Sequence, residues 1–134
     1  MRKPRSLRIL IVDDEPVIAN TLAEILSREG FESRAVYSGE EAIAIAEMFL
    51  PHAMISDVIM SGINGIQAAI EIRDRIPLCR ILLFSANVMV ADVLLEHSGL
   101  SLAFEILNKP VHPTELLAKL RAMLDEIRTD EEYR

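Results

Sequence analysis

The stretch Leu7–Glu15, with the sequence LRILIVDDE, decides the fold class, because a short apolar run ends abruptly in three acidic residues. Such a run predicts a strand that is buried on both faces of a sheet. The residues after it repeat their apolar positions at helical spacing, from Ile18 to Leu26, and Gly30 is placed to end that helix. A buried strand followed directly by a helix is the repeating unit of an α/β fold.

The same alternation recurs along the rest of the chain. Four further strand-like runs are Glu32–Tyr37, Ala53–Ser56, Arg80–Phe84 and Phe104–Leu107. Helical spacing follows them at 38–49, 65–76, 88–97 and 113–127, and the first of these stretches opens with a capping-box pattern. The sequence therefore predicts an α/β fold of the (βα)5 type, in which a doubly wound, five-stranded parallel sheet carries helices on both faces.

The chain of 134 residues fits a single domain. We expect this domain to span residues 7–127, with an N-terminal tail at 1–6 and a polar C-terminal tail at 128–134, and with no output domain inside the chain. Hydrophobic residues make up 51% of the sequence but aromatic residues only 4%, so the core is predicted to be aliphatic.

Charge and cysteine content exclude several classes of protein. The net charge of −7 argues against nucleic-acid binding, which needs a basic face. No apolar run approaches the 18 or so residues that span a bilayer, so we expect no membrane association. The single cysteine, Cys79, precludes an internal disulfide, and we expect a structural thiol in a cytoplasmic protein. His52, His97 and His112 lack metal-ligand spacing and are interpreted as surface or cap residues.

Polar residues follow four of the five predicted strands. The first strand ends in Asp13 and Asp14, the third in Asp57, the fourth in Ser85, and the fifth is followed by Lys109. The carboxyl ends of parallel strands share one edge of the sheet, where open α/β sheets bind their ligands. We therefore expect three carboxylates, a hydroxyl and an ammonium group to converge there.

The charges at this edge indicate what binds. Asp13, Asp14 and Asp57 sum to −3, and a divalent cation together with Lys109 brings that sum to zero. Oxygen ligands without histidine or cysteine favour Mg²⁺, which commonly pairs with phosphate oxygens. A carboxylate beside Mg²⁺ and a lysine can attack a phosphoryl group and form an aspartyl phosphate. Ser85 and Lys109 are placed to bind the phosphate oxygens.

These residues form four ordered motifs. The motifs are Ile11–Glu15 (IVDDE), Asp57–Met60 (DVIM) with Gly65 eight residues after Asp57, Phe84–Ala86 (FSA), and Asn108–Pro110 (NKP). Over about residues 7–127 the chain resembles bacterial two-component response-regulator receiver domains, in particular single-domain receivers of the chemotaxis-regulator kind.

The resemblance implies the flavodoxin-like strand order 2-1-3-4-5 and assigns roles to the acidic residues. Asp57 would be the phosphoacceptor and part of the metal site. Asp14 and the backbone carbonyl of Ile59 would bind Mg²⁺ directly, whereas Asp13 would act through an intervening water molecule.

The resemblance also implies how the phosphoryl group is held and who supplies it. Ser85 would be the switch hydroxyl, Ala86 and Lys109 would contact the phosphate, and the Lys109–Pro110 peptide would be cis. The donor would be a sensor histidine kinase or a histidine phosphotransfer protein. The chain would not be an enzyme acting on other substrates, although it would catalyse its own phosphorylation and slow autodephosphorylation.

Two positions depart from the family pattern. Receiver domains usually carry proline four residues after the acceptor, but this chain has Ser61, followed by Gly62, which predicts a more mobile loop. Three residues before the lysine they usually carry a rotating tyrosine or phenylalanine, and here the residue is Ile106. The aromatic half of the usual switch is therefore missing, with Phe104 two residues away on the same predicted face.

The fourth predicted helix indicates an output surface. From residue 88 to 95 its only polar residue is Asp92, so apolar side chains surround most of the helix. One interpretation is a deeply packed helix. The other is an exposed apolar patch that includes Val90 and Leu94. We expect the face formed by the fourth helix, fifth strand and fifth helix to bind a protein target or a second copy of the chain, with an affinity that phosphorylation changes through Ser85.

Other function classes fit the sequence less well. A degenerate receiver that serves as a phosphorylation-independent scaffold remains the main alternative. A phosphohydrolase of the haloacid-dehalogenase type needs Asp-x-Asp at the first strand end, which Asp13–Glu15 does not provide. A flavodoxin-like flavin carrier needs a phosphate-binding loop that acidic residues would oppose. A P-loop enzyme is excluded because its glycine-rich motif is missing.

Overall fold

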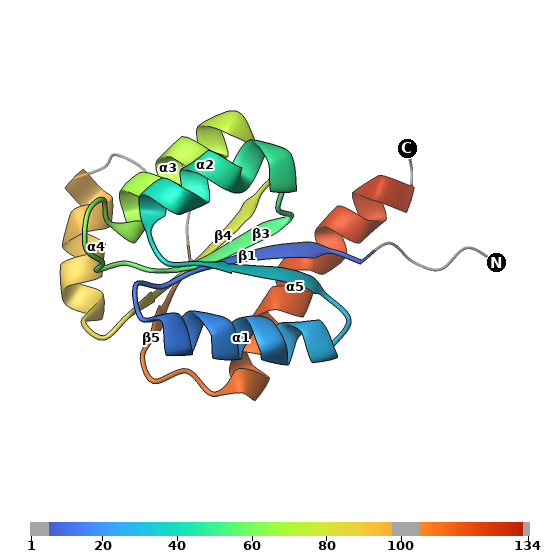
Figure 1. The fold of residues 1–134 in the computed structure, drawn as a ribbon, viewed down its shortest axis with the longest axis horizontal. Coiled ribbons are helices and arrows are strands. Elements are labelled where there is room, and N and C mark those ends of the chain that lie inside the picture. Colours follow the sequence, from blue (N-terminus) through green and yellow to red (C-terminus); the bar gives the residue numbers. More distant parts are fainter. Residues whose placement is uncertain (1–5, 98–104, 133–134) are drawn as a thin grey trace.

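The computed structural model describes residues 6–97 and 105–132, with the side chains at 88, 95, 97 and 126–132 excepted. Strands and helices alternate through this part of the chain, as Figure 1 shows. The strands are β1 (Arg8–Val12), β2 (Glu32–Val36), β3 (Ala53–Asp57), β4 (Arg80–Ser85) and β5 (Glu105–Asn108). The helices are α1 (Pro16–Arg28), α2 (Gly39–Phe49), α3 (Gly65–Arg75), α4 (Val88–His97) and α5 (Pro113–Glu132).

The five strands form one parallel sheet in the order β2-β1-β3-β4-β5. In Figure 1, α1 and α5 lie on one side of this sheet and α2 and α3 on the other. The predicted (βα)5 architecture and strand order are therefore confirmed. Parallel pairing requires each crossover helix to return the chain to the same edge, which is why every strand ends on the same side as its neighbours.

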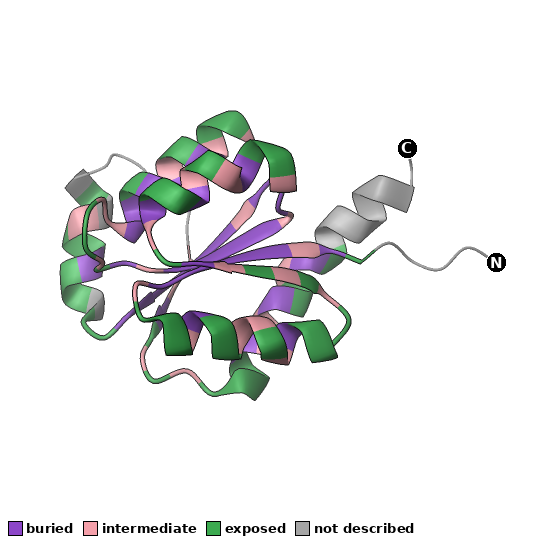
Figure 2. Cartoon of the chain, viewed as in Figure 1, coloured by how far each residue is buried: buried purple, intermediate pink, exposed green. Residues whose placement is uncertain are grey.

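Two separate apolar clusters, one for each face of the sheet, make up the core. Alternate residues of β1 divide between them, since Leu10 and Val12 belong to the cluster under α2, α3 and α4, whereas Ile9 and Ile11 belong to the cluster under α1 and α5. This division follows from the two-residue period of a strand. Figure 2 shows the result as buried strands between helices whose outer surfaces are exposed. The side chains of both clusters are mainly aliphatic, as predicted.

The ends of three strands, β3, β4 and β5, lie one residue further along the chain than the apolar pattern indicates. Asp57 pairs with Phe84 and so belongs to β3, and Ser85 pairs with Asn108 and so belongs to β4. Apolar patterning stops at the first polar residue, but the backbone ladder does not. The fifth strand begins at Glu105 in the described part of the chain, and the predicted residue Phe104 lies outside it.

Side-chain caps mark where the helices begin. The Ser38 side chain accepts a hydrogen bond from the backbone N–H of Glu41 at the start of α2. A complete capping box, with both reciprocal bonds, begins α3 at Asn64 and Gln67. Nδ1 of His112 accepts a bond from the backbone N–H of Thr114 near the start of α5, in keeping with its interpretation as a cap.

Of the two other histidines, the structure describes the side chain of one, His52. His52 is half-buried, and its Nδ1 accepts a hydrogen bond of 2.9 Å from the backbone N–H of Arg8. The side chain of His97 lies outside the described residues. Within the part of the chain that the structure describes, no helix combines the length and the apolar character needed to cross a membrane.

The thiol of Cys79 provides a test of the core. Cys79 is buried, and burial raises the pKa of its thiol to about 12, although the charges of Arg73 and Arg80 act in the opposite direction. An unfolded chain with a thiol pKa near 9 holds on the order of a thousandfold more thiolate at pH 8. We therefore expect iodoacetamide at pH 8 to leave the native protein unlabelled over the time in which it fully alkylates the protein in denaturant. Equal labelling rates would contradict the buried position.

Candidate functional site

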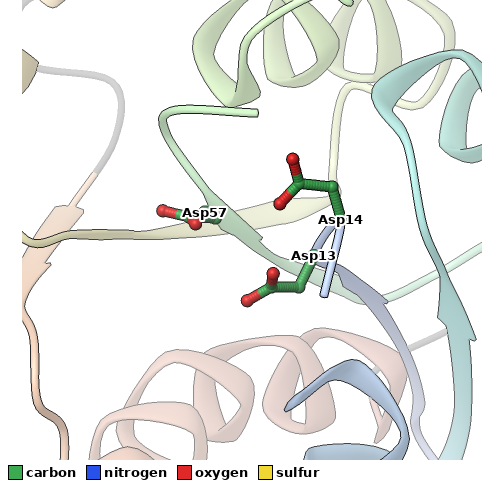
Figure 3. Close-up of side chains that lie close together, drawn as sticks. All are labelled: Asp13, Asp14 and Asp57. Atoms are coloured by element: carbon green, nitrogen blue, oxygen red, sulfur yellow. The ribbon is translucent and has the colours of Figure 1, made fainter. Parts of the chain in front are cut away.

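Three carboxylates meet where β1 and β3 end. Asp13 and Asp14 directly follow β1, and Asp57 is the last residue of β3. The two strands are paired so that Val12 lies opposite Ser56, which brings their carboxyl ends side by side. One carboxylate oxygen from each aspartate lies within 4.8 Å of the others, and Figure 3 shows the three side chains grouped at these strand ends. The predicted convergence of the three acids is therefore present in the structure.

The cluster carries a strong internal repulsion. At an effective dielectric constant of about 20, two carboxylate charges 4.8 Å apart repel by roughly 3 to 4 kcal/mol. Asp13 is only 3% exposed, and burial raises the pKa of its carboxyl group. The backbone N–H of Glu15, 2.9 Å from Oδ1 of Asp13, and the charge of Lys109 lower that pKa, while the charges of Asp57 and Asp14 raise it. The cluster therefore favours a cation that can neutralise it.

Lys109 supplies one positive charge to this cluster. Its Nζ lies 3.1 Å from Oδ2 of Asp57 and 3.8 Å from Oδ2 of Asp13. The lysine follows β5, and its backbone N–H donates to the carbonyl oxygen of Ser85 over 2.9 Å, which joins the ends of β4 and β5. The Lys109–Pro110 peptide is cis, in agreement with the expectation from the family resemblance. Asp13 after β1, Asp57 at the end of β3 and the lysine after β5 thus form one charged group.

Ser85 and Ala86 lie at the same edge of the sheet. Ser85 is buried, and its hydroxyl donates to the carbonyl oxygen of Asn87 over 2.9 Å and accepts from the Asn87 N–H over 3.1 Å. Ala86 is exposed beside it. The structure therefore places both predicted phosphate-binding residues at the carboxyl end of β4, with the Ser85 hydroxyl bonded within its own turn.

The loop between β3 and α3 contributes a contact that sequence reasoning missed. The backbone N–H and the hydroxyl of Ser61 both donate to Oδ2 of Asp14, over 3.1 and 3.3 Å. Ile59, whose carbonyl was expected to bind the metal, lies on the same loop with its side chain 55% exposed. From the sequence alone, Ser61 was expected only to loosen this loop. The sequence did offer one signal for this contact, since the residue four positions after Asp57 has both an amide hydrogen and a hydroxyl that can donate hydrogen bonds.

The predicted switch and output positions divide between core and surface. Ile106 is half-buried and packs against the apolar cluster under α4. Leu94 also packs against that cluster but is only half-buried, so part of its surface remains exposed. Val90 is 43% exposed, and Met89 and Val93 are 79% and 52% exposed on the same helix. The exposed apolar face of α4, within the described residues, therefore consists of Met89, Val90 and Val93.

An apolar groove of about 530 Å³ adjoins the charged cluster. It is lined by Ile18, Leu22, Phe84, Ala86, Lys109, Pro110, Val111 and Leu116. The groove thus joins the first half of α1 to the segment between β5 and α5, and Lys109 belongs both to its wall and to the acidic site.

The donor set fits Mg²⁺. Asp13, Asp14 and Asp57 offer carboxylate oxygens alone, and hard divalent cations prefer oxygen ligands. The burial of Asp13 also supports a cation at this site, because a buried carboxylate needs a compensating positive charge. The same burial raises the pKa of this carboxyl group.

Comparison with known proteins shows the family of the chain. Residues 9–121 match the model of the response regulator receiver domain. The chain is 34% identical over 120 residues to the DNA-binding response regulator MtrA of Mycolicibacterium smegmatis, covering 87% of this chain and 50% of the relative. It is 33% identical over 118 residues to the alkaline phosphatase synthesis transcriptional regulatory protein PhoP of Bacillus subtilis, covering 87% and 48%. The chain thus spans about half the length of these curated relatives.

A solved structure of a response regulator has the same fold as this chain. The response regulator protein TrrA of Thermotoga maritima, determined in complex with Mg²⁺ and BeF, superposes with a TM-score of 0.75 at 34% identity, covering 88% of this chain and 99% of that one. The family match extends over most of the chain and over the β1, β3, β4 and β5 ends that form the acidic site. This chain therefore belongs to the response regulator receiver domains of two-component systems, whose general function is to accept a phosphoryl group on an aspartate.

Proposed function

We propose that Asp57 is the phosphoacceptor of this receiver domain and that it reacts with the help of Mg²⁺. The observation that carries the proposal is the grouping of Asp57 with Asp13, Asp14 and Lys109, in which Nζ of Lys109 lies 3.1 Å from the Asp57 carboxylate. Asp57 is half-buried, so its carboxylate is accessible to a donor, whereas Asp13 is buried. This difference supports a nucleophilic role for Asp57 and the role of a fixed charge for Asp13.

The reaction follows from these positions. A carboxylate oxygen of Asp57 attacks the phosphorus atom of a phosphohistidine, the P–N bond breaks, and the donor histidine leaves with the bonding electron pair. Lys109 holds Asp57 in place and afterwards pairs with a phosphate oxygen. Bound Mg²⁺ supplies positive charge that offsets the charge developing on the phosphoryl oxygens. Asp14, Asp57 and the carbonyl of Ile59 are the groups proposed to hold it directly, with Asp13 acting through an intervening water molecule. Ala86 and Ser85 are proposed to contact the phosphate.

We propose a sensor histidine kinase or a histidine phosphotransfer protein as the donor, acting in the cytoplasm on the domain at 7–127. The apolar groove beside Lys109 supports a protein donor, because a partner helix there would bring its histidine next to Asp57. The single buried thiol fits a reducing compartment. The relatives named as DNA-binding regulators are about twice as long as this chain, and the acidic charge of this chain gives no support for a DNA contact of its own.

The proposal is tested by adding a small phosphodonor. We expect acetyl phosphate with Mg²⁺ to add one phosphoryl group per chain, measured by intact-mass spectrometry, and we expect a metal chelator to prevent it. No kinase is needed, because the site itself assembles the reacting groups. A protein that binds Mg²⁺ yet gains no phosphoryl group from any small donor or kinase would support the scaffold alternative instead.

The exposed apolar face of α4, formed by Met89, Val90 and Val93, is the proposed output surface. Exposed apolar patches on folded domains commonly mark interaction sites. We expect Val90→Glu to weaken self-association or target binding of the phosphorylated protein at least tenfold in sedimentation or pull-down titrations, while phosphorylation stays unchanged. Leu78→Glu, at a leucine after α3 that is 61% exposed, serves as the control. Unchanged association in phosphorylated Val90→Glu would show that the signal leaves by another face.

A further inference from the structure

Ser61 donates two hydrogen bonds to one oxygen of the acidic site. Its backbone N–H lies 3.1 Å and its hydroxyl 3.3 Å from Oδ2 of Asp14. The first bond requires an amide hydrogen and the second a hydroxyl, so proline, which has neither, could make no such contact. The residue at this position therefore gives the chain a connection between the β3–α3 loop and the acidic cluster.

Asp14 is the carboxylate of the cluster that most needs such a contact. Asp13 is buried and bonded to the Glu15 N–H, and Asp57 is paired with Lys109. Within the described residues, the contacts that involve the Asp14 side chain come from Ser61. Two nearby carboxylates repel Asp14, and nothing buries it as Asp13 is buried. Repulsion alone would turn its side chain toward solvent.

The loop is supported on its other side by α2, which keeps Ser61 in place. Oε1 of Glu40 accepts a bond of 3.4 Å from the backbone N–H of Ile63. The same carboxylate lies so close to Gly62 that a Cβ atom there would come within 2.5 Å of Oε2 of Glu40. The segment containing Ser61 therefore lies between Asp14 and Glu40, with backbone hydrogen bonds to both carboxylates.

We propose that Ser61 is a positioning residue for the metal site: its two hydrogen bonds hold Asp14 beside Asp13 and Asp57 and so pre-assemble the ligands for a divalent cation. The inference rests on the proposed function, because it assumes that Mg²⁺ binds this cluster. A ligand that is already in place does not have to be drawn in from solvent when the cation arrives, so the affinity for the cation rises.

Titration calorimetry of the full chain with Mg²⁺ tests the proposal. We expect Ser61→Ala, which keeps the amide bond and loses the hydroxyl bond, to bind Mg²⁺ about fivefold more weakly than the unaltered chain. Ser61→Thr keeps both donors and should restore the affinity. Ser27→Ala, at the opposite end of α1 from Asp14, is the matched control and should have no effect. Unchanged or tighter Mg²⁺ binding by Ser61→Ala would overturn the proposal, and tighter binding would show that Ser61 restrains Asp14 from the cation.

A second comparison separates positioning from a general effect on the loop. In an Asp14→Ala background, Ser61→Ala should cause no further loss of Mg²⁺ affinity, because the carboxylate that it positions is gone. The Ser61 amide proton should also move upfield in the NMR spectrum of Asp14→Ala. The same loss of affinity in both backgrounds would contradict the proposal. If the unaltered chain itself binds no Mg²⁺, the proposed function fails and the inference fails with it, whereas normal binding that is insensitive to Ser61 refutes the inference alone.

Discussion

Asp57→Asn is expected to abolish phosphorylation completely. The amide has nearly the same shape as the carboxylate, so the fold is preserved, but its oxygen is a poor nucleophile and cannot form the acyl phosphate. The substitution also removes one of three charges that repel each other, so the variant should be at least as stable as the unaltered chain. Phosphate incorporation from labelled acetyl phosphate should fall below detection while the melting temperature stays equal or rises.

The control for this result is Asp74→Asn, a substitution of the same kind at an exposed aspartate of α3. It should incorporate phosphate at the rate of the unaltered chain. Incorporation that persists in folded Asp57→Asn would mean that another group receives the phosphoryl. A loss in both variants would mean that the assay reports charge or folding instead of the acceptor.

Gly65→Ala is expected to have the largest effect on stability. Gly65 is the first residue of α3, where alanine would normally favour the helix by about 1 kcal/mol. Here alanine is expected to destabilise the protein instead, because its Cβ atom would lie 2.1 Å from the backbone carbonyl oxygen of Asp57 and 3.0 Å from Oγ of Ser56. Forced overpacking of this kind costs about 3 kcal/mol or more. The melting temperature should fall by roughly 10 °C.

The same substitution should also disturb the site, because the atoms that must move belong to Asp57 and its neighbours. We expect the rate of phosphorylation to fall at least tenfold under conditions where Gly65→Ala is folded. Gly30→Ala is the control: the backbone of Gly30, with φ at 96°, is unfavourable for alanine, but no atom lies within 4 Å of the added methyl group. It should cost about 1 kcal/mol of stability and leave phosphorylation unchanged. Equal effects of the two substitutions would show that the close approach to Asp57 has no special consequence.

The convergence of the charged groups could be predicted from the sequence because it depends on backbone topology alone. Once buried strands alternate with helices, parallel pairing follows, and the residues after each strand must meet at one edge. No knowledge of side-chain conformation was needed to predict that Asp13, Asp57 and Lys109 lie close together. The charges then limited the choice of ligand. The strand order and the cis peptide, in contrast, were expected only from the family resemblance.

The features that escaped prediction depend on the direction of single side chains. Apolar periodicity in α4 is too continuous to show how deeply each side chain is buried, so it could not distinguish the exposed Val90 from Leu94, which is half-buried against the core. The bonds from Ser61 to Asp14 join residues 47 positions apart on two loops, and no local pattern encodes such a contact. Strand ends at Asp57 and Ser85 were set one residue short because hydrophobicity stops there while backbone pairing continues.

Identifying the residue that carries the phosphoryl group directly tests the assignment of Asp57 as the acceptor. The chain is phosphorylated with acetyl phosphate and Mg²⁺, reduced with borohydride so that an acyl phosphate becomes an alcohol, and digested for peptide mass spectrometry. We predict that Asp57 is converted to homoserine and that Asp13 and Asp14 are unmodified. Reduction at Asp13 or Asp14 with Asp57 intact would contradict it.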